Sequence, residues 1–339
     1  MRVGFNPHKD KIQPASVYFH QVIIPVYIPN QEGYFKDSFE ILKLCLDSLF
    51  KTIHDKTYVT VVNNGSCDII VEYLNVLYKA NKIQEIIHVT NIGYINAMLK
   101  GITGQNFSLI TTSDVDVLFL DGWQNATYSI FENFPKAGAV CPTPSSRSFK
   151  RYTSNIYWDN LFFNKIQFND VVNPLALKAF GYSVGDSNFY NSIQLKKNLT
   201  LSRAGYKAVL GAGHFVVTYR ASIFNALESR YTDYILGGNS DDIFDLPVAK
   251  KGFWRLSTSD NYAYHMGNVL EDWMPNTISK LIQNNEGTDF ELKCVQSSSK
   301  LAYFVKSKLF AKLILNKKIM RYFLIWKGLS REEAKNYLK

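Results

Sequence analysis

The sequence has few cysteines and lacks any long hydrophobic run. Its four cysteines are widely spread over 339 residues, without the spacing of a zinc site or a disulfide framework. No run of about eighteen apolar residues occurs, and residues 1–20 carry charges and prolines where a signal peptide has an apolar segment. Repeats and low-complexity segments are also absent. We therefore expect a reduced, cytoplasmic protein without a cleaved signal or a membrane-spanning helix.

What the sequence does contain is enough apolar material for a large core. Hydrophobic residues make up 46% of the chain and aromatic residues 14%, which fits one large domain or one and a half. The formal net charge is +9. Residues 297–339 hold eleven Lys or Arg against two Glu, and 11 − 2 = +9, so the remaining chain is neutral. This distribution argues against nucleic-acid binding by the body and for an anionic surface contacted by the tail.

Two aspartates stand at the centre of the most informative stretch, residues 109–120. An apolar, β-branched run precedes Ser113-Asp114-Val115-Asp116, and a second apolar run follows it. This order predicts a buried strand that ends in two carboxylates. In extended backbone, residues two apart point to the same side, so both carboxylates can approach one cation. Oxygen ligands of this kind suit Mn²⁺ or Mg²⁺ bound to substrate phosphates. The alternative is a solvated turn.

Strands alternate with helices in the first third of the chain, which predicts a parallel sheet built from βαβ units. The expected strands cover residues 22–28, 58–62, 85–89 and 107–112, and the expected helices cover residues 37–52, 68–79 and about 94–101. Such sheets bind nucleotides at the carboxyl ends of their strands. Pro25, the turn that contains Asn63 and Asn64, and Asp114 all fall at those ends.

The order and spacing of these segments resemble the large inverting glycosyltransferase family 2. The matching segments are residues 22–29, Cys45-Leu46-Asp47-Ser48-Leu49, Val61-Val62-Asn63-Asn64-Gly65-Ser66, Asn91-x-Gly93 and Ser113-Asp114-Val115-Asp116. The resemblance covers about residues 20–122. It implies a GT-A fold, with a Rossmann-like, mostly parallel sheet covered by helices on both faces. It also implies transfer of a sugar from a nucleotide-sugar donor with Mn²⁺ or Mg²⁺. We expect a catalytic domain at 1–270, with its nucleotide-sugar-binding half at about 20–122 and its acceptor half at about 123–270.

The resemblance also implies a set of donor-binding residues. They are Pro25, Tyr27, Asn63, Asn64, Asn91, Gly93, Asp114 and Gly213. The family usually has an Asp in the turn where this chain has Asn63 and Asn64. An Asn side chain still accepts a hydrogen bond through its carbonyl oxygen, so a pyrimidine base, and hence a UDP-sugar, stays the first expectation. The alternative role of the two asparagines is plain turn formation before Gly65.

A second block, residues 206–268, contributes the remaining site candidates. Gly211-x-Gly213 lacks the third glycine of a dinucleotide site, which argues against nicotinamide or flavin binding, and the family resemblance makes residues 209–220 one Gly-rich strand ending in an Arg. Asp241 and Asp242 open an expected helix through Lys250, at the place where the family carries its catalytic base. We expect Asp242 to be the base, with Asp241 second. The alternative is a helix cap.

Histidines offer one further ligand candidate. His265 matches the His that closes the family's core, and the resemblance makes it a third metal ligand beside Asp114 and Asp116 or a diphosphate contact. A purely structural role for His265 is the alternative. His214 lies in an apolar segment and is expected in the core or in a pocket wall.

Two regions lie outside the resemblance. Residues 125–205 mix polar and aromatic side chains, which suits a sugar acceptor face or a packed α+β insertion. Residues 271–339 are expected to form a helical, basic region. In it Val305, Leu309 and Leu313 share one helix face, and Phe310 and Ile314 do not lie on that face. We expect this region to dock on the anionic inner face of the plasma membrane. The alternatives are helices packed on the catalytic domain or a protein partner.

The sequence as a whole predicts a metal-dependent inverting glycosyltransferase. Its expected acceptor is a hydroxyl of a glycan or a lipid-linked precursor, in bacterial surface polysaccharide synthesis, with no nucleic acid involved. Two other classes stay open. A sugar nucleotidyltransferase would need a basic, Gly-rich loop after the first strand, and residues 27–33 hold one Gly and no Lys or Arg. A non-catalytic scaffold would explain the Asn63-Asn64 and Asp241 departures, but not the presence of Asp114, Asp116, Asp242 and His265 together.

Overall fold

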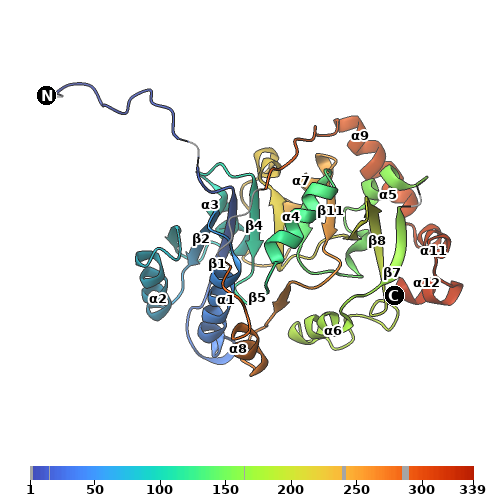
Figure 1. The fold of residues 1–339 in the computed structure, drawn as a ribbon, viewed down its shortest axis with the longest axis horizontal. Helices are drawn as coiled ribbons and strands as arrows, with labels where there is room; N and C mark the ends of the chain where they lie inside the picture. The colour runs from blue at the N-terminus through green and yellow to red at the C-terminus, as the bar shows by residue number, and fades with distance from the viewer. Residues whose placement is uncertain (1–2, 15, 164, 239–241, 285–289) are drawn as a thin grey trace.

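The computed structural model describes residues 3–14, 16–163, 165–238, 242–284 and 290–339. Residues 3–14 form an arm that extends away from the body (Figure 1). The strands are β1 (His20–Val26), β2 (Thr57–Asn64), β3 (Glu85–Val89), β4 (Leu109–Ser113), β5 (Val117–Phe119), β6 (Ala137–Cys141), β7 (Ile166–Asp170), β8 (Lys197–Arg203), β9 (Tyr206–Leu210), β10 (Val216–Arg220), β11 (Trp254–Ser257) and β12 (Ala263–His265). The α-helices are α1 (Ser38–Thr52), α2 (Asp68–Lys79), α3 (Tyr94–Ile102), α4 (Trp123–Asn133), α5 (Ser154–Asn160), α6 (Pro174–Ser183), α7 (Asp242–Lys250), α8 (Trp273–Ile278), α9 (Lys300–Phe304), α10 (Phe310–Ile314), α11 (Lys317–Trp326) and α12 (Arg331–Tyr337).

Ten strands form the central sheet, in the order β3-β2-β1-β4-β10-β6-β11-β9-β8-β7. Strands β3, β2, β1, β4, β6, β11 and β8 run in one direction, and β10, β9 and β7 run in the other. The predicted βαβ half is confirmed, because β3, β2, β1 and β4 pair in parallel. The short strands β5 and β12 make a separate antiparallel pair.

Alternation along β1 explains why helices cover both faces of the parallel half. Every residue of β1 is buried. Val22, Ile24 and Val26 pack with α1 and α2 on one face, whereas Ile23 packs with α3 on the other. Successive side chains of a strand point to opposite faces, so a strand buried on both sides reads as one continuous apolar run.

Two strand predictions need correction. The first strand ends at Val26, two residues earlier than expected. The single strand predicted over residues 209–220 is divided into β9 and β10, which are not neighbours in the sheet. The division falls at Gly211, whose φ is +93° and whose backbone approaches Ser148 so closely that a Cβ would lie 2.2 Å from the Ser148 carbonyl oxygen. Only glycine tolerates this conformation and this contact.

The C-terminal helices pack into the core of the second half of the molecule. Buried residues Phe310, Ile314, Met320 and Phe323 join the cluster that also contains Tyr157 of α5. A π-helical turn at Val305–Leu309 shifts the helical register between α9 and α10. The core buries Phe310 and Ile314, whereas Leu309 and Leu313, on the face that they were expected to share with Val305, are 51% and 54% exposed. Among the described residues, no helix combines the length and apolarity needed to cross a membrane.

Two buried histidines form a polar network at the amino end of β1. The His54 Nδ1 atom accepts from the Lys56 backbone N–H, so its Nε2 carries the proton and donates to Tyr128 Oη at 2.8 Å. Tyr128 then donates to His20 Nδ1 at 2.6 Å, and His20 Nε2 donates to Thr111 Oγ1. Both imidazoles are thus neutral in the folded protein. Burial, with a smaller contribution from His54, lowers the pKa of His20, and burial lowers the pKa of His54 to about 4.

This network predicts a loss of stability in mild acid. An unfolded histidine titrates near pH 6.5, so between pH 6.5 and about 4 the unfolded chain binds protons that the folded chain excludes. The contribution of the neutral imidazoles to the free energy of unfolding should be fully present above pH 6.5. It should be lost as the pH drops through this window, and it amounts to about 1.4 kcal/mol for each unit of pKa difference between the folded and the unfolded chain. Urea unfolding of wild type and His54→Gln at pH 7 and pH 5 measures the effect.

The expected result is a smaller pH 7 to pH 5 difference in His54→Gln than in wild type. His8→Gln is the control, because His8 lies in the exposed N-terminal arm and should leave the wild-type difference unchanged. An equal pH dependence in wild type and His54→Gln would contradict the assignment of neutral, buried imidazoles.

Candidate active site

Three side chains that could ligate a metal converge at the carboxyl end of β4. Oxygens of Asp114 and Asp116 and a ring nitrogen of His265 all lie within 4.8 Å of one another. Asp114 follows β4 directly, and its backbone N–H donates to the Phe215 carbonyl next to β10. The pairing of β12 with β5 places His265 opposite Val117, which brings His265 Nε2 to 3.4 Å from Asp116 Oδ2. Sheet pairing thus assembles residues about 150 positions apart in the sequence.

The groups around this cluster orient its ligands. Tyr94 Oη donates to the Asp114 carboxylate, and Ser183 Oγ lies 3.0 Å from His265 Nδ1. A hydrogen bond at Nδ1 fixes the imidazole ring and leaves Nε2 facing Asp116. Burial raises the pKa of the Asp116 carboxyl, and His265 opposes this shift. Two partly buried carboxylates and an imidazole are the donor set that Mn²⁺ or Mg²⁺ accepts, and a cation there would offset the desolvation of the carboxylates.

A cavity of about 300 Å³ adjoins the cluster. Asp114, His265 and Gly213 line it together with apolar and aromatic side chains of α6 and the segment after it, among them Leu177, Phe180 and Tyr190. These side chains belong to residues 125–205, the stretch for which sequence left an acceptor face and a packed insertion open. His214 also lines this cavity, so it is a pocket-wall residue.

Asp242 is the first residue of α7 and is held by an arginine. Arg151 bridges two carboxylates, with one nitrogen 3.0 Å from Asp242 Oδ1 and another 3.1 Å from Asp245 Oδ2. Asp245 is fully buried and also pairs with buried Arg255 at 2.9 Å. Paired charges of this kind fix the orientation of the helix that carries them. Asp241 lies outside the described residues.

The cavity wall is linked to this charge cluster through His214. Its Nε2 lies 3.5 Å from Asp245 Oδ2. Burial, with the nearby Arg255 and Arg151 charges, lowers the pKa of His214 to about 3, so the imidazole is neutral at physiological pH. Tyr152 lies beside Asp242, and burial together with its hydrogen bond to that carboxylate raises the pKa of Tyr152 to about 12.

The two asparagines after β2 form hydrogen bonds within the protein. Asn63 Oδ1 accepts from the Ser66 backbone, and its amide nitrogen lies 2.9 Å from His88 Nδ1. Asn64 accepts from the Ile92 backbone and donates to Asn91. Both side chains are 3% exposed. They therefore fasten the β2 turn to the loop that leads into α3, next to Tyr94 and the metal-ligand candidates.

The remaining predicted donor residues lie along the same edge of the sheet. Gly93 caps α3 with φ +88°, and a Cβ there would lie 3.0 Å from the Tyr234 carbonyl oxygen. Asn91 accepts from the Gly93 N–H and so shapes this loop. Pro25 is buried within β1, and Tyr27 follows that strand with 39% of its surface exposed.

Sequence reasoning missed several residues that shape the site. Tyr94 directly follows the Asn91-x-Gly93 segment, so its position could have suggested a role. Arg255 stands between apolar neighbours in β11, and a charged residue inside an apolar strand signals a buried ion pair. Arg151, Asp245 and Ser183 carried no such signal, because only the folded chain brings them to Asp242 and His265.

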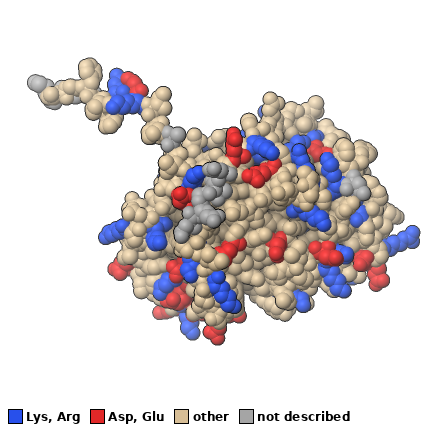
Figure 2. Space-filling model, viewed as in Figure 1, with Lys and Arg blue, Asp and Glu red and all other residues tan. Residues whose placement is uncertain are grey.

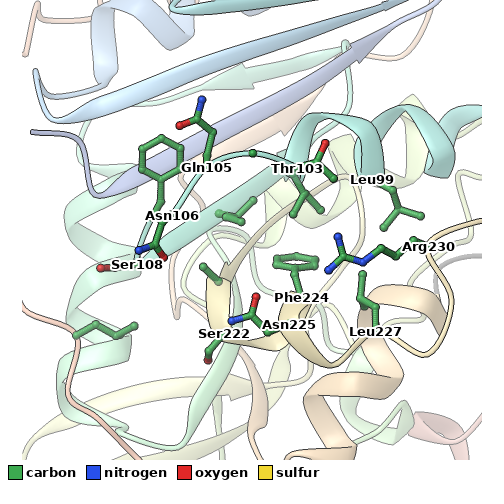
Figure 3. A pocket seen from close by; sticks show the side chains of 16 residues that line it. Leu99, Thr103, Gln105, Asn106, Ser108, Ser222, Phe224, Asn225, Leu227 and Arg230 are labelled. Atoms are coloured by element: carbon green, nitrogen blue, oxygen red, sulfur yellow. The ribbon is translucent and has the colours of Figure 1, made fainter. Parts of the chain in front are cut away.

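A second cavity, of about 440 Å³, shares no residue with the first (Figure 3). It lies between the end of α3 and the segment after β10, and Thr103, Phe224, Asn225 and Arg230 are among its lining residues. None of the described residues predicted for the site lines it, whereas Asp114, Gly213 and His265 line the smaller cavity. Asp242 lines neither cavity.

Comparison with solved structures finds partial likenesses. Residues 1–349 of TarS from S. aureus, in complex with UDP-GlcNAc, are 15% identical, with 94% of this chain and 70% of that chain covered and a TM-score of 0.43. The mannosyltransferase PcManGT from Pyrobaculum calidifontis, in complex with GDP-Man and Mn²⁺, is 14% identical, with 96% and 76% covered and a TM-score of 0.42. No curated protein matches the sequence.

A family model identifies the chain more directly. The model of glycosyl transferase family 2 matches residues 22–191, which is half of the chain and includes β1, the Asp114–Asp116 segment and α6. The match also takes in most of residues 125–205, the stretch that lay outside the resemblance visible in the sequence. The chain therefore belongs to glycosyl transferase family 2 and is a glycosyltransferase.

Proposed function

We propose that this protein is a metal-dependent, inverting glycosyltransferase that moves a sugar from a nucleotide-sugar to a hydroxyl group. The observation that carries the proposal is the convergence of Asp114, Asp116 and His265 beside a cavity that also reaches His214. We take a UDP-sugar as the first donor to test. A glycan or lipid-linked acceptor in bacterial surface polysaccharide synthesis, at the inner face of the plasma membrane, completes the proposal.

In the proposed mechanism, Asp114, Asp116 and His265 would hold Mn²⁺ or Mg²⁺. The cation would supply the positive charge that stabilises the departing nucleoside diphosphate. Tyr94 and Ser183 keep Asp114 and His265 in the ligating orientation. The aromatic wall of α6 and the following segment excludes water and presents apolar faces on which sugar rings stack.

Asp242 takes the proton from the acceptor hydroxyl in this proposal. A hydroxyl attacks an anomeric carbon only when a nearby base accepts its proton, and inversion places that base on the face opposite the leaving group. Arg151 positions the Asp242 carboxylate, with one nitrogen 3.0 Å from Asp242 Oδ1. His214, being neutral, adds no positive charge beside Asp245.

A thermal-shift panel tests the donor site. UDP, GDP, dTDP and CMP are each added with and without Mn²⁺, and the melting temperature is recorded. We expect one nucleotide, UDP first, to raise the melting temperature by several degrees only when Mn²⁺ is present, because the metal links the diphosphate to the aspartates. The absence of a shift with every nucleotide would contradict a metal-dependent donor site.

A further inference from the structure

The C-terminal helices expose apolar side chains that have no cover within the described part of the chain. Along α9, the π-helical turn and α10, Leu301 is 72% exposed and Phe304, Leu309 and Leu313 are each more than half exposed. The buried face of the same segment is formed by Phe310 and Ile314. The segment therefore has two apolar faces, of which the core uses one. Large apolar side chains gathered on a surface are a mark of an interaction site.

Lysines are interleaved with these exposed apolar residues. Lys300, Lys308 and Lys312 are exposed on the same segment, and the sequence has no Asp or Glu between Glu291 and Glu332. Figure 2 shows Lys and Arg side chains, with acidic side chains among them, over the end of the molecule where α9 and α11 lie, as over the rest of this face. A surface that combines lysines with Leu and Phe complements a partner that is both anionic and apolar.

A second segment, which packs against the C-terminal helices, exposes further aromatic side chains. Trp158 of α5 stacks edge-on against Phe310 of α10, with ring centroids 5.1 Å apart. The chain then turns and exposes Phe162 by 91% and Phe163 by 55%, with Lys165 over the Phe163 ring. Asp159, the acid of this segment, is neutralised by Lys136 and Lys306. Aromatic tips beside lysines are typical of side chains that sit at a lipid headgroup boundary.

We propose that these residues form a docking face for an anionic phospholipid bilayer. The docking face consists of Trp158, Phe162, Phe163, Lys165, Lys300, Leu301, Phe304, Lys308, Leu309, Lys312 and Leu313. Its apolar side chains enter the headgroup region while its lysines pair with lipid phosphates. A second protein copy or a protein partner would need acidic groups opposite the lysines, whereas an anionic bilayer supplies negative charge over the whole face.

The docking face adjoins the helix of the proposed catalytic base. The Ser298 backbone N–H, just before α9, donates to the Lys251 carbonyl at 2.8 Å, directly after α7. The Ser298 side chain fills the space above Gly252, where a Cβ would lie 1.9 Å from Ser298 Oγ. Docking would thus hold the carboxyl end of α7 next to the lipid surface, with Asp242 at the other end of this nine-residue helix, about 12 Å along its axis. This step rests on the proposed function, because it brings lipid-linked acceptors to within one helix length of the base.

Vesicle flotation of the full-length protein tests the docking face. The probes are vesicles of phosphatidylcholine with 30% phosphatidylglycerol and vesicles of phosphatidylcholine alone. One variant removes the apolar contacts: Leu301→Ser, Leu309→Ser and Leu313→Ser. A second reverses the charges: Lys300→Glu, Lys308→Glu and Lys312→Glu.

Matched controls alter exposed residues at the opposite end of the molecule: Ile69→Ser, Val76→Ser and Tyr78→Ser on α2, and Lys79→Glu, Lys82→Glu and Lys280→Glu.

We expect wild type and both controls to float with the anionic vesicles, and both docking-face variants to lose at least tenfold in vesicle binding. Wild type should bind neutral vesicles far less. Failure of wild type to float with anionic vesicles, or equal losses in the controls, would overturn the proposal. So would a concentration-dependent dimer that the Leu-to-Ser variant abolishes, because a second copy would then cover the face.

The nucleotide thermal shift on the same proteins separates the two proposals. Docking-face variants should keep the wild-type response to nucleotide and Mn²⁺, since none of their residues lines the metal cluster or its cavity. Flotation without any nucleotide response would overturn the proposed function and support the docking face. A normal nucleotide response without flotation would overturn the docking face and support the proposed function.

Discussion

Replacing Asp116 with Ala is expected to lower sugar transfer by about 10²- to 10³-fold or more. The same variant should lose the Mn²⁺-dependent thermal shift with nucleotide. The physical reason is the position of this carboxylate, which is nearly buried and lies 3.4 Å from His265 Nε2. Without it, the metal site has one carboxylate and one imidazole, and the charge of the departing diphosphate is left largely unbalanced. Transfer is measured by release of nucleoside diphosphate, and binding by the melting temperature.

Asp170→Ala is the matched control for this experiment. Asp170 lies on β7 with its side chain 85% exposed, and it pairs with Lys197 at the surface. Its removal should change neither the transfer rate nor the thermal shift. An Asp116→Ala variant that kept its metal-dependent nucleotide shift would show that the ligands lie elsewhere, and the mechanism proposed for Asp114 and His265 would fall with it.

Asp242→Asn is expected to lower kcat by about 10²- to 10⁴-fold, the usual contribution of a general base. The amide keeps a similar shape and an oxygen that can accept from Arg151, so the helix should keep its place. Donor binding should be unchanged, because Asp242 is outside the cluster of Asp114, Asp116 and His265. Loss of kcat with an intact nucleotide thermal shift is the signature that separates a base from a metal ligand.

The control for this variant is Asp233→Asn, nine residues earlier. Asp233 is exposed in the segment before α7, so losing its charge should leave kcat at the wild-type level. If Asp242→Asn also retained kcat, the base would have to be another group, and Asp241 would be the next residue to replace.

Much of the parallel half of the fold could be predicted from sequence alone. The boundaries of α2 and β3 agree with the pattern residue for residue, because apolar residues with helical spacing alternate there with short β-branched runs. The Asp114–Asp116 segment could also be recognised, since both carboxylates belong to one local stretch between two apolar runs. Local pattern suffices where neighbouring residues decide the structure.

The C-terminal segment shows what local pattern left open. Its apolar residues do not form one stripe, and sequence alone gives no reason to expect the π-helical turn at Val305–Leu309. In the folded chain, Phe310 and Ile314 are buried in the cluster that contains Tyr157 and Phe323. Tertiary packing thus decided which face is buried and which is left exposed with its lysines.

For the candidate site, too, the sequence and the tertiary structure determined different features. The sequence by itself determined the chemical groups: two carboxylates two residues apart, a histidine near the end of the core and an acid at a helix start. Only the tertiary structure decided their neighbours. Pairing of β5 with β12 brings His265 to Asp116, and an arginine 91 positions away holds Asp242. Contacts between residues so distant depend on sheet pairing and burial across the whole chain, which no local pattern encodes.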